Sequence, residues 1–582
     1  MRRTLARRPD HDRPGHDHPG RAGQPAPQRR SRRSADGIGA WWLLAAVLPV
    51  AFLAVFFAWP VAAMLLRGIA PEGVLDLSAF AQVLGAERTW RILGQTLGMA
   101  AAATVCSVAV GLPAAFVLYR RRFPGRAVLR GVVTVPFVLP TVVVGVAFRA
   151  LLSPGGPLGF TGLDQTTTAV VLAMVFFNVS VVVRQVGAMW AGLDPRQAEA
   201  ARVLGASGWR AWRTVTLPQL APAIVSAASL VFLFCSAAFG IVQTLGRPGH
   251  GTLETEVWAQ TVVFFDLRAA AVFSVLQFAV VLAAVGVSGW AASRAGRALR
   301  LQDARVPPLT RADAAPAAVA AALGLLIVLP IATLVVRSFH SAEGWGLHNY
   351  RLLTTAGAGF TGGTTVAEAL EHSVKIALDA TWLTLLAGVP LALLLTRGFR
   401  SRTAVRAQRA LDGAVMLPLG VSAVTVGFGF VVSLRAQWPE LAASGALVPA
   451  AQAVVALPLV VRSLVPVLAA VDPRLREAAQ TLGASPWRVL LTVDGPFVLR
   501  GVGLAAGFAF AVSLGEFGAT TFLASPDYQT LPVVIVRLLG RPGADNYGMA
   551  LAGAVVLAAL TAAVMIMCER LRPRGAGAEG AW

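Results

Sequence analysis

The sequence predicts an all-α, polytopic membrane protein with about twelve transmembrane helices, built as two tandem six-helix units. Three observations support this prediction: an excess of apolar residues, their division into runs long enough to cross a bilayer, and an internal repeat. Hydrophobic residues make up 56% of the 582 residues and charged residues only 14%, and the mean hydropathy is +0.67. A soluble protein has too little interior to hide that much apolar surface beneath so few charges. We therefore expect the apolar residues to face lipid.

The basic residues are distributed as expected for a membrane protein. The net charge of +21 comes from 50 Lys+Arg against 29 Asp+Glu, and Lys375 is the sole lysine. The arginines fall in short clusters between apolar runs instead of along one polar domain, a pattern that indicates an arginine-biased cytoplasmic face and no nucleic-acid partner. Cys106, Cys235 and Cys568 lie in apolar stretches without a CxxC or pairing pattern. They predict neither a disulfide nor a metal site.

The chain starts with a polar segment. Residues 1–40 are rich in Arg, Pro, Gly and Asp, a composition that predicts a disordered, basic cytoplasmic tail. The apolar run at 41–66 is longer than the core of a signal peptide and has no clear cleavage site. We interpret it as the first membrane helix, retained in the protein.

Apolar runs of about 20 residues or more, the length that spans a bilayer, recur along the rest of the chain. Pro136 and Pro140 lie inside one of these runs and Pro418 inside another, and all three are expected to kink their spans. The predicted spans are 41–66, 92–118, 129–152, 168–191, 218–245 and 268–292, followed by 316–337, 374–396, 410–434, 446–470, 497–523 and 547–568.

Loops rich in arginine alternate with loops that are acidic or poor in arginine, such as the one holding Glu254 and Glu256. Positive-inside bias places the arginine loops and both termini in the cytoplasm. Each half has an even number of spans, so both halves have the same orientation. The predicted organisation is a tail at 1–40, a first unit at 41–300, a cytoplasmic linker at 301–315, a second unit at 316–572 and a tail at 573–582.

Two of the arginine-rich loops repeat each other. Residues 194–218 read DPRQAEAARVLGASGWRAWRTVTLP and residues 472–496 read DPRLREAAQTLGASPWRVLLTVDGP, which gives 15 identities in 25 positions at an offset of 278. The same offset aligns Gly240 with Gly518. A fixed offset across two loops and two spans indicates tandem duplication of a six-span unit.

The repeated loop is expected to fold as a helix–turn–helix on the membrane face. Asp194 and Asp472 are good N-caps, each followed by a proline. The first helix should end near Gly205 and Gly483, and a serine two residues later can cap a second short helix. One alternative is an interfacial helix anchored by Trp and Arg at the headgroups. Two near-identical copies favour a docking surface for a repeated or dimeric partner.

The loop resembles the coupling loop of the permease subunits of ABC importers, which carries Glu-Ala-Ala, three residues, Gly, nine residues, an aliphatic residue, any residue and Leu-Pro. Gly495 replaces the leucine in the second copy, which affects the entry of the next span. In this family the loop docks on an ATP-binding subunit. The matching residues are Glu199, Ala200, Ala201, Gly205, Val215, Leu217 and Pro218, and then Glu477, Ala478, Ala479, Gly483, Val493 and Pro496.

Beyond the tail, nearly the whole chain is similar to the fused double permeases of the thiamine and ferric-iron group. The stretches that look most like the thiamine branch are 119–126, 175–178, 514–518 and 528–532. The resemblance implies transport of a small solute, thiamine first and ferric iron next, from an extracytoplasmic binding protein into the cytoplasm. It also implies a separate ATP-binding partner, and the likeness of the two loops favours a homodimer.

The chain itself is not expected to hydrolyse ATP. It contains no Gly-x-x-x-x-Gly-Lys-Ser/Thr sequence, and Lys375 follows no glycine-rich loop. A P-loop needs that lysine and the backbone cradle before it to hold phosphates. We therefore expect no catalytic residues and no cofactor on this chain, with ATP and magnesium bound by the partner subunit.

Polar residues inside the predicted spans are candidates for the transport pathway because they are costly in lipid. Glu516 is the clearest, since the first half has an alanine at the equivalent position. A carboxylate on one side only would suit a cationic substrate. The structural alternative is that Glu516 bonds to neighbours such as Ser513 and Thr520. Gln243 and Asn178 are further candidates, although single amides commonly join helices.

Two other classes of protein fit the sequence less well. An ion-coupled secondary transporter with a 6+6 repeat would show carboxylates or broken helices at equivalent positions of both halves, whereas the best repeat here lies in cytoplasmic loops. A membrane enzyme or a channel is a third possibility. The spans contain no nucleophile–base pair, no HExxH and no cluster of metal ligands.

Overall fold

The computed structural model describes residues 46–70, 74, 76–247, 251–295, 306–359, 362–397, 402–526 and 528–570. All of them belong to one compact unit within Ala45–Trp582. The tails predicted at 1–40 and 573–582 lie outside the described residues, as does the first third of the predicted linker.

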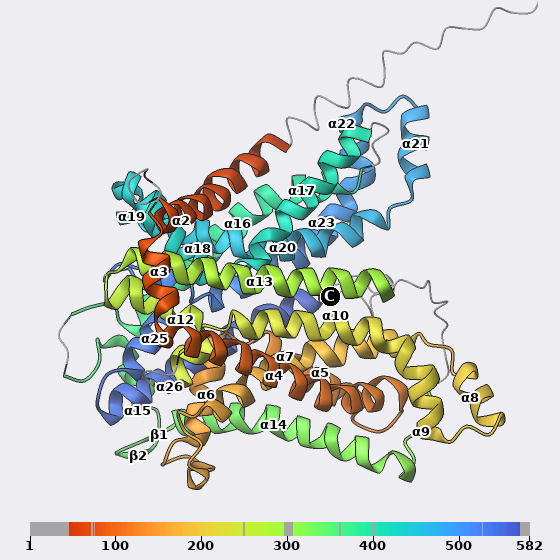
Figure 1. Cartoon of the computed structure of the whole chain (residues 1–582), viewed down its shortest axis with the longest axis horizontal. Coiled ribbons are helices and arrows are strands. Elements are labelled where there is room, and N and C mark those ends of the chain that lie inside the picture. The colour runs from red at the N-terminus through yellow and green to blue at the C-terminus, as the bar shows by residue number, and fades with distance from the viewer. Residues whose placement is uncertain are drawn as a thin grey trace, which may run out of the picture. The chain divides into compact units, whose positions relative to one another are not determined.

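In the first half of the described chain, all the long elements are helices (Figure 1). A continuous helix over Ala46–Ile69 contains α2 and forms the first candidate span. The helices of this half are α2 (Trp59–Ile69), α3 (Ser78–Gly85), α4 (Glu87–Arg120), α5 (Arg126–Thr134), α6 (Thr141–Leu152), α7 (Thr167–Ala191), α8 (Arg196–Val203), α9 (Gly208–Ala211), α10 (Leu217–Ser236), α11 (Gly240–Leu245), α12 (Leu253–Trp258) and α13 (Leu267–Ala295).

The second half repeats this order and adds a short antiparallel hairpin, β1 (His340–Ser341) paired with β2 (Gly344–Trp345). Its helices are α14 (Ala314–Ser338), α15 (His348–Arg351), α16 (Val366–Leu395), α17 (Arg402–Gly420), α18 (Ala423–Phe430), α19 (Pro439–Ala443), α20 (Leu447–Ala469), α21 (Pro473–Thr481), α22 (Pro486–Val489), α23 (Gly495–Gly515), α24 (Thr520–Leu523), α25 (Leu531–Leu539) and α26 (Ala544–Arg570).

The predicted fold class is confirmed. Among the described residues, ten helices are long and apolar enough to cross a membrane, and two bent helix pairs bring the number to as many as twelve. The bends measure 107° between α5 and α6 and 91° between α17 and α18, and they fall at the predicted kinks beside Pro140 and Pro418. Proline at these positions removes a backbone N–H donor and interrupts the hydrogen bonds of the helix.

Two further predicted spans are also not continuous helices. The run at 218–245 divides into α10 and α11, and the run at 497–523 divides into α23 and α24. A glycine lies at the equivalent point of each division, where it approaches another helix: an added Cβ would lie 3.4 Å from the Val142 nitrogen at Gly240 and 3.2 Å from the Val424 nitrogen at Gly518. Hydropathy alone does not reveal these breaks because the residues around them are apolar.

The duplication seen in the sequence is matched by a hydrogen bond that occurs at equivalent places in both halves. The backbone amide of Leu253, which begins α12, donates to the Thr96 hydroxyl over 3.0 Å. At the equivalent place in the second half, the amide of Leu531, which begins α25, donates to the Ser373 hydroxyl over 2.8 Å. The same contact at an offset of 277 or 278 residues means that the two halves fold alike.

The halves exchange their first helices. The first helix of the second half, α14, packs against α4, α5 and α6 of the first half, while α2 packs against α18 of the second half. The apolar core therefore runs across both halves. The predicted limits of the two units, 41–300 and 316–572, divide the sequence and stay a prediction.

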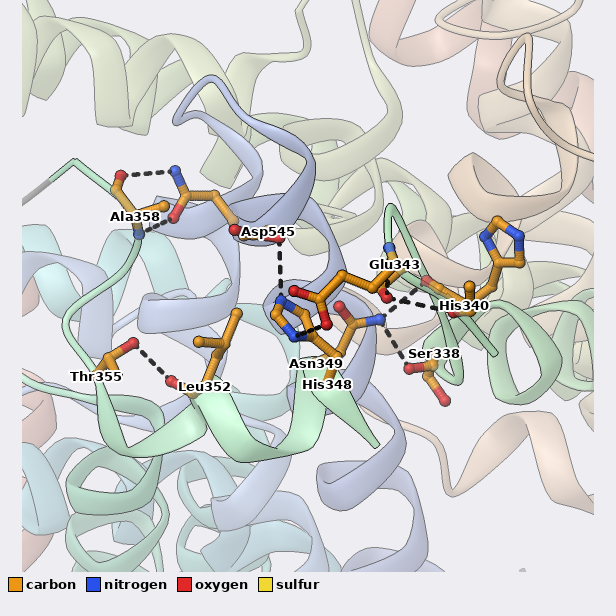
Figure 2. Close-up of polar contacts among 12 residues, drawn as sticks. Ser338, His340, Glu343, His348, Asn349, Leu352, Thr355, Ala358 and Asp545 are labelled. Carbon is orange, nitrogen blue, oxygen red and sulfur yellow. Dashed lines mark hydrogen bonds and ion pairs between the residues drawn. The ribbon is translucent and has the colours of Figure 1, made fainter. Parts of the chain in front are cut away.

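The repeated loops lie at one end of the compact unit, the right-hand end in Figure 1, where α8, α9, α21 and α22 are seen. The opposite end holds the hairpin and α15. In Figure 2, His348 reaches Glu343 of the hairpin over 3.0 Å and Asp545 of α26 over 3.4 Å. Asn349 donates to the Ser338 carbonyl over 2.9 Å. These contacts attach the hairpin to the start of the last helix.

Candidate functional site

Both repeated loops adopt the predicted helix–turn–helix. In each copy the aspartate accepts a hydrogen bond from the backbone amide two residues later: over 3.0 Å at Asp194 and over 2.9 Å at Asp472. The first helix ends at a glycine with a positive φ, +89° at Gly205 and +82° at Gly483. Glycine adopts this backbone conformation without the steric cost that a side chain brings.

The second short helix of each loop is also capped as predicted. Ser207 accepts from the Arg210 amide over 3.2 Å, and Ser485 accepts from the Arg488 amide over 3.3 Å. These local caps satisfy backbone donors that a helix start leaves free. The loop fold therefore follows from the repeated sequence itself.

The residues that match the coupling motif are exposed in the same order in both copies. Each glutamate and the alanine after it are exposed, the second alanine is half-buried and the glycine is exposed. Each glutamate lies on the first helix of its loop, α8 or α21. The residues arranged in this way are Glu199, Ala200, Ala201 and Gly205 in the first loop and Glu477, Ala478, Ala479 and Gly483 in the second.

Large apolar side chains are exposed beside the motif in both loops. Leu204 and Leu482 are 87% and 88% exposed, and Trp209 and Trp487 are each 67% exposed. A soluble surface rarely carries a contiguous group of such residues unless a partner covers it. The two loops thus present matching surfaces at one end of the molecule.

The loops are attached to the helices differently. In the first half, Arg120 at the end of α4 donates to the carbonyls of Trp190 and Leu193. In the second half, the equivalent Arg397 pairs with the fully buried Asp494. Burial lowers the pKa of Arg397, and the charge of Asp494 opposes that shift. The second attachment is therefore an ion pair where the first uses backbone carbonyls.

Glu516 is held by its own neighbours. Its carboxylate accepts hydrogen bonds from the Ala519 amide over 2.7 Å, from the Thr520 amide over 3.0 Å and from the Thr520 hydroxyl. These bonds start α24, and they match the structural alternative set out from the sequence. A role for Glu516 in the transport pathway stays a prediction.

The two amide candidates also have local surroundings. Asn178 donates to the Met174 carbonyl over 3.0 Å and to the Cys235 sulfur over 3.3 Å, which joins α7 to α10. Gln243 lies half-buried in α11. Among the described residues no hydrogen bond joins Glu516, Gln243 and Asn178 to one another. Their place in the pathway stays a prediction.

A group of residues that the sequence does not predict lies where the halves meet. Phe239 and Phe517, equivalent at the 278-residue offset, stack with ring centroids 5.1 Å apart. Glu254 belongs to the buried helix α12, although we expected a loop residue, and it accepts a hydrogen bond from Ser422 of the other half. The offset could have singled out the phenylalanine pair. No sequence signal indicates that Glu254 folds back into the bundle.

The comparisons with known proteins agree with the fold and the loops. Residues 107–341 match the model of the family described as "Binding-protein-dependent transport system inner membrane component". The chain is 26% identical over 469 residues to the thiamine transport system permease protein ThiP of Escherichia coli strain K12, covering 78% of this chain and 84% of that protein. It is 27% identical over 573 residues to the probable ABC transporter permease protein y4fN of Sinorhizobium fredii, covering 91% and 96%.

Among solved structures, a bacterial ABC transporter involved in the import of the acidic polysaccharide alginate aligns with a TM-score of 0.38 at 17% identity, over 45% of this chain and 96% of that one.

These findings identify the class of protein. The chain is a multi-pass membrane permease of the ABC importer class, and over most of its length it is similar to known transport permeases. The family consists of transport permeases, not enzymes, and ATP hydrolysis in ABC importers takes place on a separate subunit. The interpretation as an ion-coupled secondary transporter is therefore wrong.

Proposed function

We propose that this chain is the double permease of an importer that takes up thiamine, delivered by an extracytoplasmic binding protein and driven by a separate ATPase. One observation favours thiamine over other substrates. The chain resembles thiamine transport permeases of Escherichia coli, Salmonella typhimurium and Brucella abortus at 25–26% identity over 78–84% of its length. Ferric iron is the substrate to test next.

The matching loop surfaces support a dimeric ATPase as the partner. Glu199 and Glu477 are exposed on equivalent helices, and Leu204 and Leu482 differ in exposure by a single percentage point. Two copies of one protein would meet two such surfaces with the same contacts, because a two-fold dimer presents the same patch twice. Homodimerisation of the ATPase follows as part of the proposal.

The position of the arginines supports an orientation with the loops in the cytoplasm. Arg120, Arg196 and Arg210 lie in or beside the first repeated loop, and Arg474 and Arg488 lie in the second. Positive-inside bias places this end in the cytoplasm. Both termini then lie on the cytoplasmic side, and the hairpin end faces the binding protein.

Reconstitution tests the proposal. The chain is purified with its ATPase and placed in liposomes that contain ATP, and the binding protein is added outside with radiolabelled thiamine or with ferric iron. We expect thiamine to accumulate inside only when ATP can be hydrolysed, and iron not to accumulate. Accumulation of iron without thiamine would assign the chain to the iron branch, and accumulation of neither would overturn the proposed substrate.

A further inference from the structure

The two halves meet at a pair of equivalent residues. Phe239 and Phe517 stack with an interplanar angle of 17°, and their exposed fractions are 5% and 4%. In an arrangement with approximate two-fold symmetry, a residue contacts its own equivalent only near the symmetry axis. The stacked rings therefore mark the axis between the halves, and they are packed together there.

The backbone is broken at both rings. Phe239 lies between α10 and α11, and Phe517 lies between α23 and α24. Non-helical backbone at membrane depth is tolerated where it is buried in protein or lines a water-filled cavity. Transporters place substrate sites at such breaks, between their repeats. The axis is thus the place where a solute would pass.

A carboxylate lies beside this axis in one half only. Glu254 is fully buried, and one of its oxygens accepts from the Ser422 hydroxyl across the boundary between the halves. Its Oε1 has no hydrogen-bond partner among the described residues. At the 278-residue offset the second half has Pro532. The free oxygen is a buried acceptor in need of a partner.

The nearby carboxylates differ from Glu254. The oxygens of Glu256 are bonded to Arg88 over 3.0 Å and to Gln260 over 2.8 Å. Glu516 accepts bonds on both of its oxygens from the start of α24. Of these three buried carboxylates, Glu254 alone keeps bonding capacity at the boundary between the halves.

A third aromatic ring completes the group. Trp258 lies four residues after Glu254 in α12, so the two side chains share a helix face. Its ring centroid lies 6.5 Å from that of Phe239. Rings beside a carboxylate are the surroundings that a flat organic cation prefers, because the ring faces and the negative oxygen both attract positive charge.

We infer that Glu254, Trp258 and the Phe239–Phe517 pair form a gate that recognises a flat organic cation on its way between the halves. This inference rests on the proposed function, since thiamine carries a permanent positive charge on an aromatic ring. When the halves separate, the rings unstack and the Ser422 bond to Glu254 breaks. The carboxylate then exchanges the hydroxyl for the cation.

The test uses the complete transporter in liposomes and compares Glu254→Gln, Glu254→Asp and a control, Glu87→Gln. Glu87 is exposed, and among the described residues its ion-pair partner is Arg91, four residues on. Thiamine uptake and the ATPase activity stimulated by the loaded binding protein are both measured. We expect Glu254→Gln to lower uptake at least about tenfold and to leave stimulated ATPase activity within about twofold. Glu254→Asp should restore part of the uptake, and the control should match the wild type.

The outcomes separate this inference from the proposed function. Wild-type uptake with equal uptake by Glu254→Gln would overturn the gate and leave the thiamine proposal standing. Loss of uptake, stimulated ATPase activity and yield together, with no rescue by Glu254→Asp, would mean that the residue is structural. Failure of the wild type to take up thiamine would overturn the proposed substrate and the gate with it.

Discussion

Arg476, in the first helix of the second repeated loop, forms an ion pair with Asp494 over 2.8 Å. Asp494 is fully buried where the loop joins α23, and it also pairs with Arg397 at the end of α16. One carboxylate thereby connects the exposed loop to two membrane helices. The first half has Thr216 in place of the carboxylate, so only the second loop is attached in this way.

Replacing Asp494 by asparagine should weaken the link between the ATPase and the helices. Removing one partner of a buried ion pair costs about 3–5 kcal/mol, because the remaining charges are left uncompensated. We expect Asp494→Asn to lower the melting temperature in detergent and the ratio of solute imported to ATP hydrolysed. Thr216→Ala, the matched change in the first half, should alter stability by less than about 0.5 kcal/mol. Equal effects of the two changes would contradict an asymmetric attachment.

The double substitution Glu199→Ala plus Glu477→Ala should uncouple transport from the ATPase. Both side chains are exposed, so membrane insertion and yield should be unchanged. Uptake should fall because the docking contacts are lost from both loops. Copurification of the ATPase and uptake are measured at equal expression, with Glu87→Ala, a change at an exposed glutamate at the start of α4, as the control. Wild-type uptake by the double variant would refute the docking assignment.

Gly111 on α4 should not tolerate alanine. An added Cβ would lie 2.7 Å from a methyl carbon of Val182, and at the equivalent Gly388 it would lie 2.8 Å from one of Val460. Overpacking of this kind typically costs 1–3 kcal/mol. Gly98, on the same helix, has open space around its Cα, so Gly98→Ala should be neutral or stabilising by up to about 1 kcal/mol. Thermal unfolding in detergent compares Gly111→Ala, Gly388→Ala and Gly98→Ala. Equal melting temperatures of the three variants would contradict the close approach of the helices at Gly111 and Gly388.

The proposed orientation predicts which residues a reagent outside the cell can reach. In a chain with Cys106→Ala, cysteine introduced at Glu343 should react with a membrane-impermeant maleimide on intact cells. Cysteine introduced at Ser207 or Ser485 should react only after the membrane is opened, because the proposed orientation places those loops in the cytoplasm. The reverse labelling pattern would invert the topology and exclude ATPase docking on these loops.

Much of the fold could be predicted because its causes are local. Apolar runs of spanning length predict the membrane helices, and Pro140 and Pro418 predict the two bends. The capped loops follow from Asp194, Ser207 and their copies. The internal offset also pairs Phe239 with Phe517, although their stacking is visible only in the structure.

The sequence by itself determined the membrane class, the duplicated halves and the helix–turn–helix loops, since hydropathy, proline and capping residues act within a few residues of the chain. Only the tertiary structure decided that Glu254 is buried against Ser422, 168 residues away, and that Asp494 holds Arg397 from 97 residues earlier. Such partners depend on how helices pack across the two halves. The sequence around a carboxylate in an acidic stretch is the same whether the side chain faces water or the other half. Only the packing of the helices determines which of these surroundings it has.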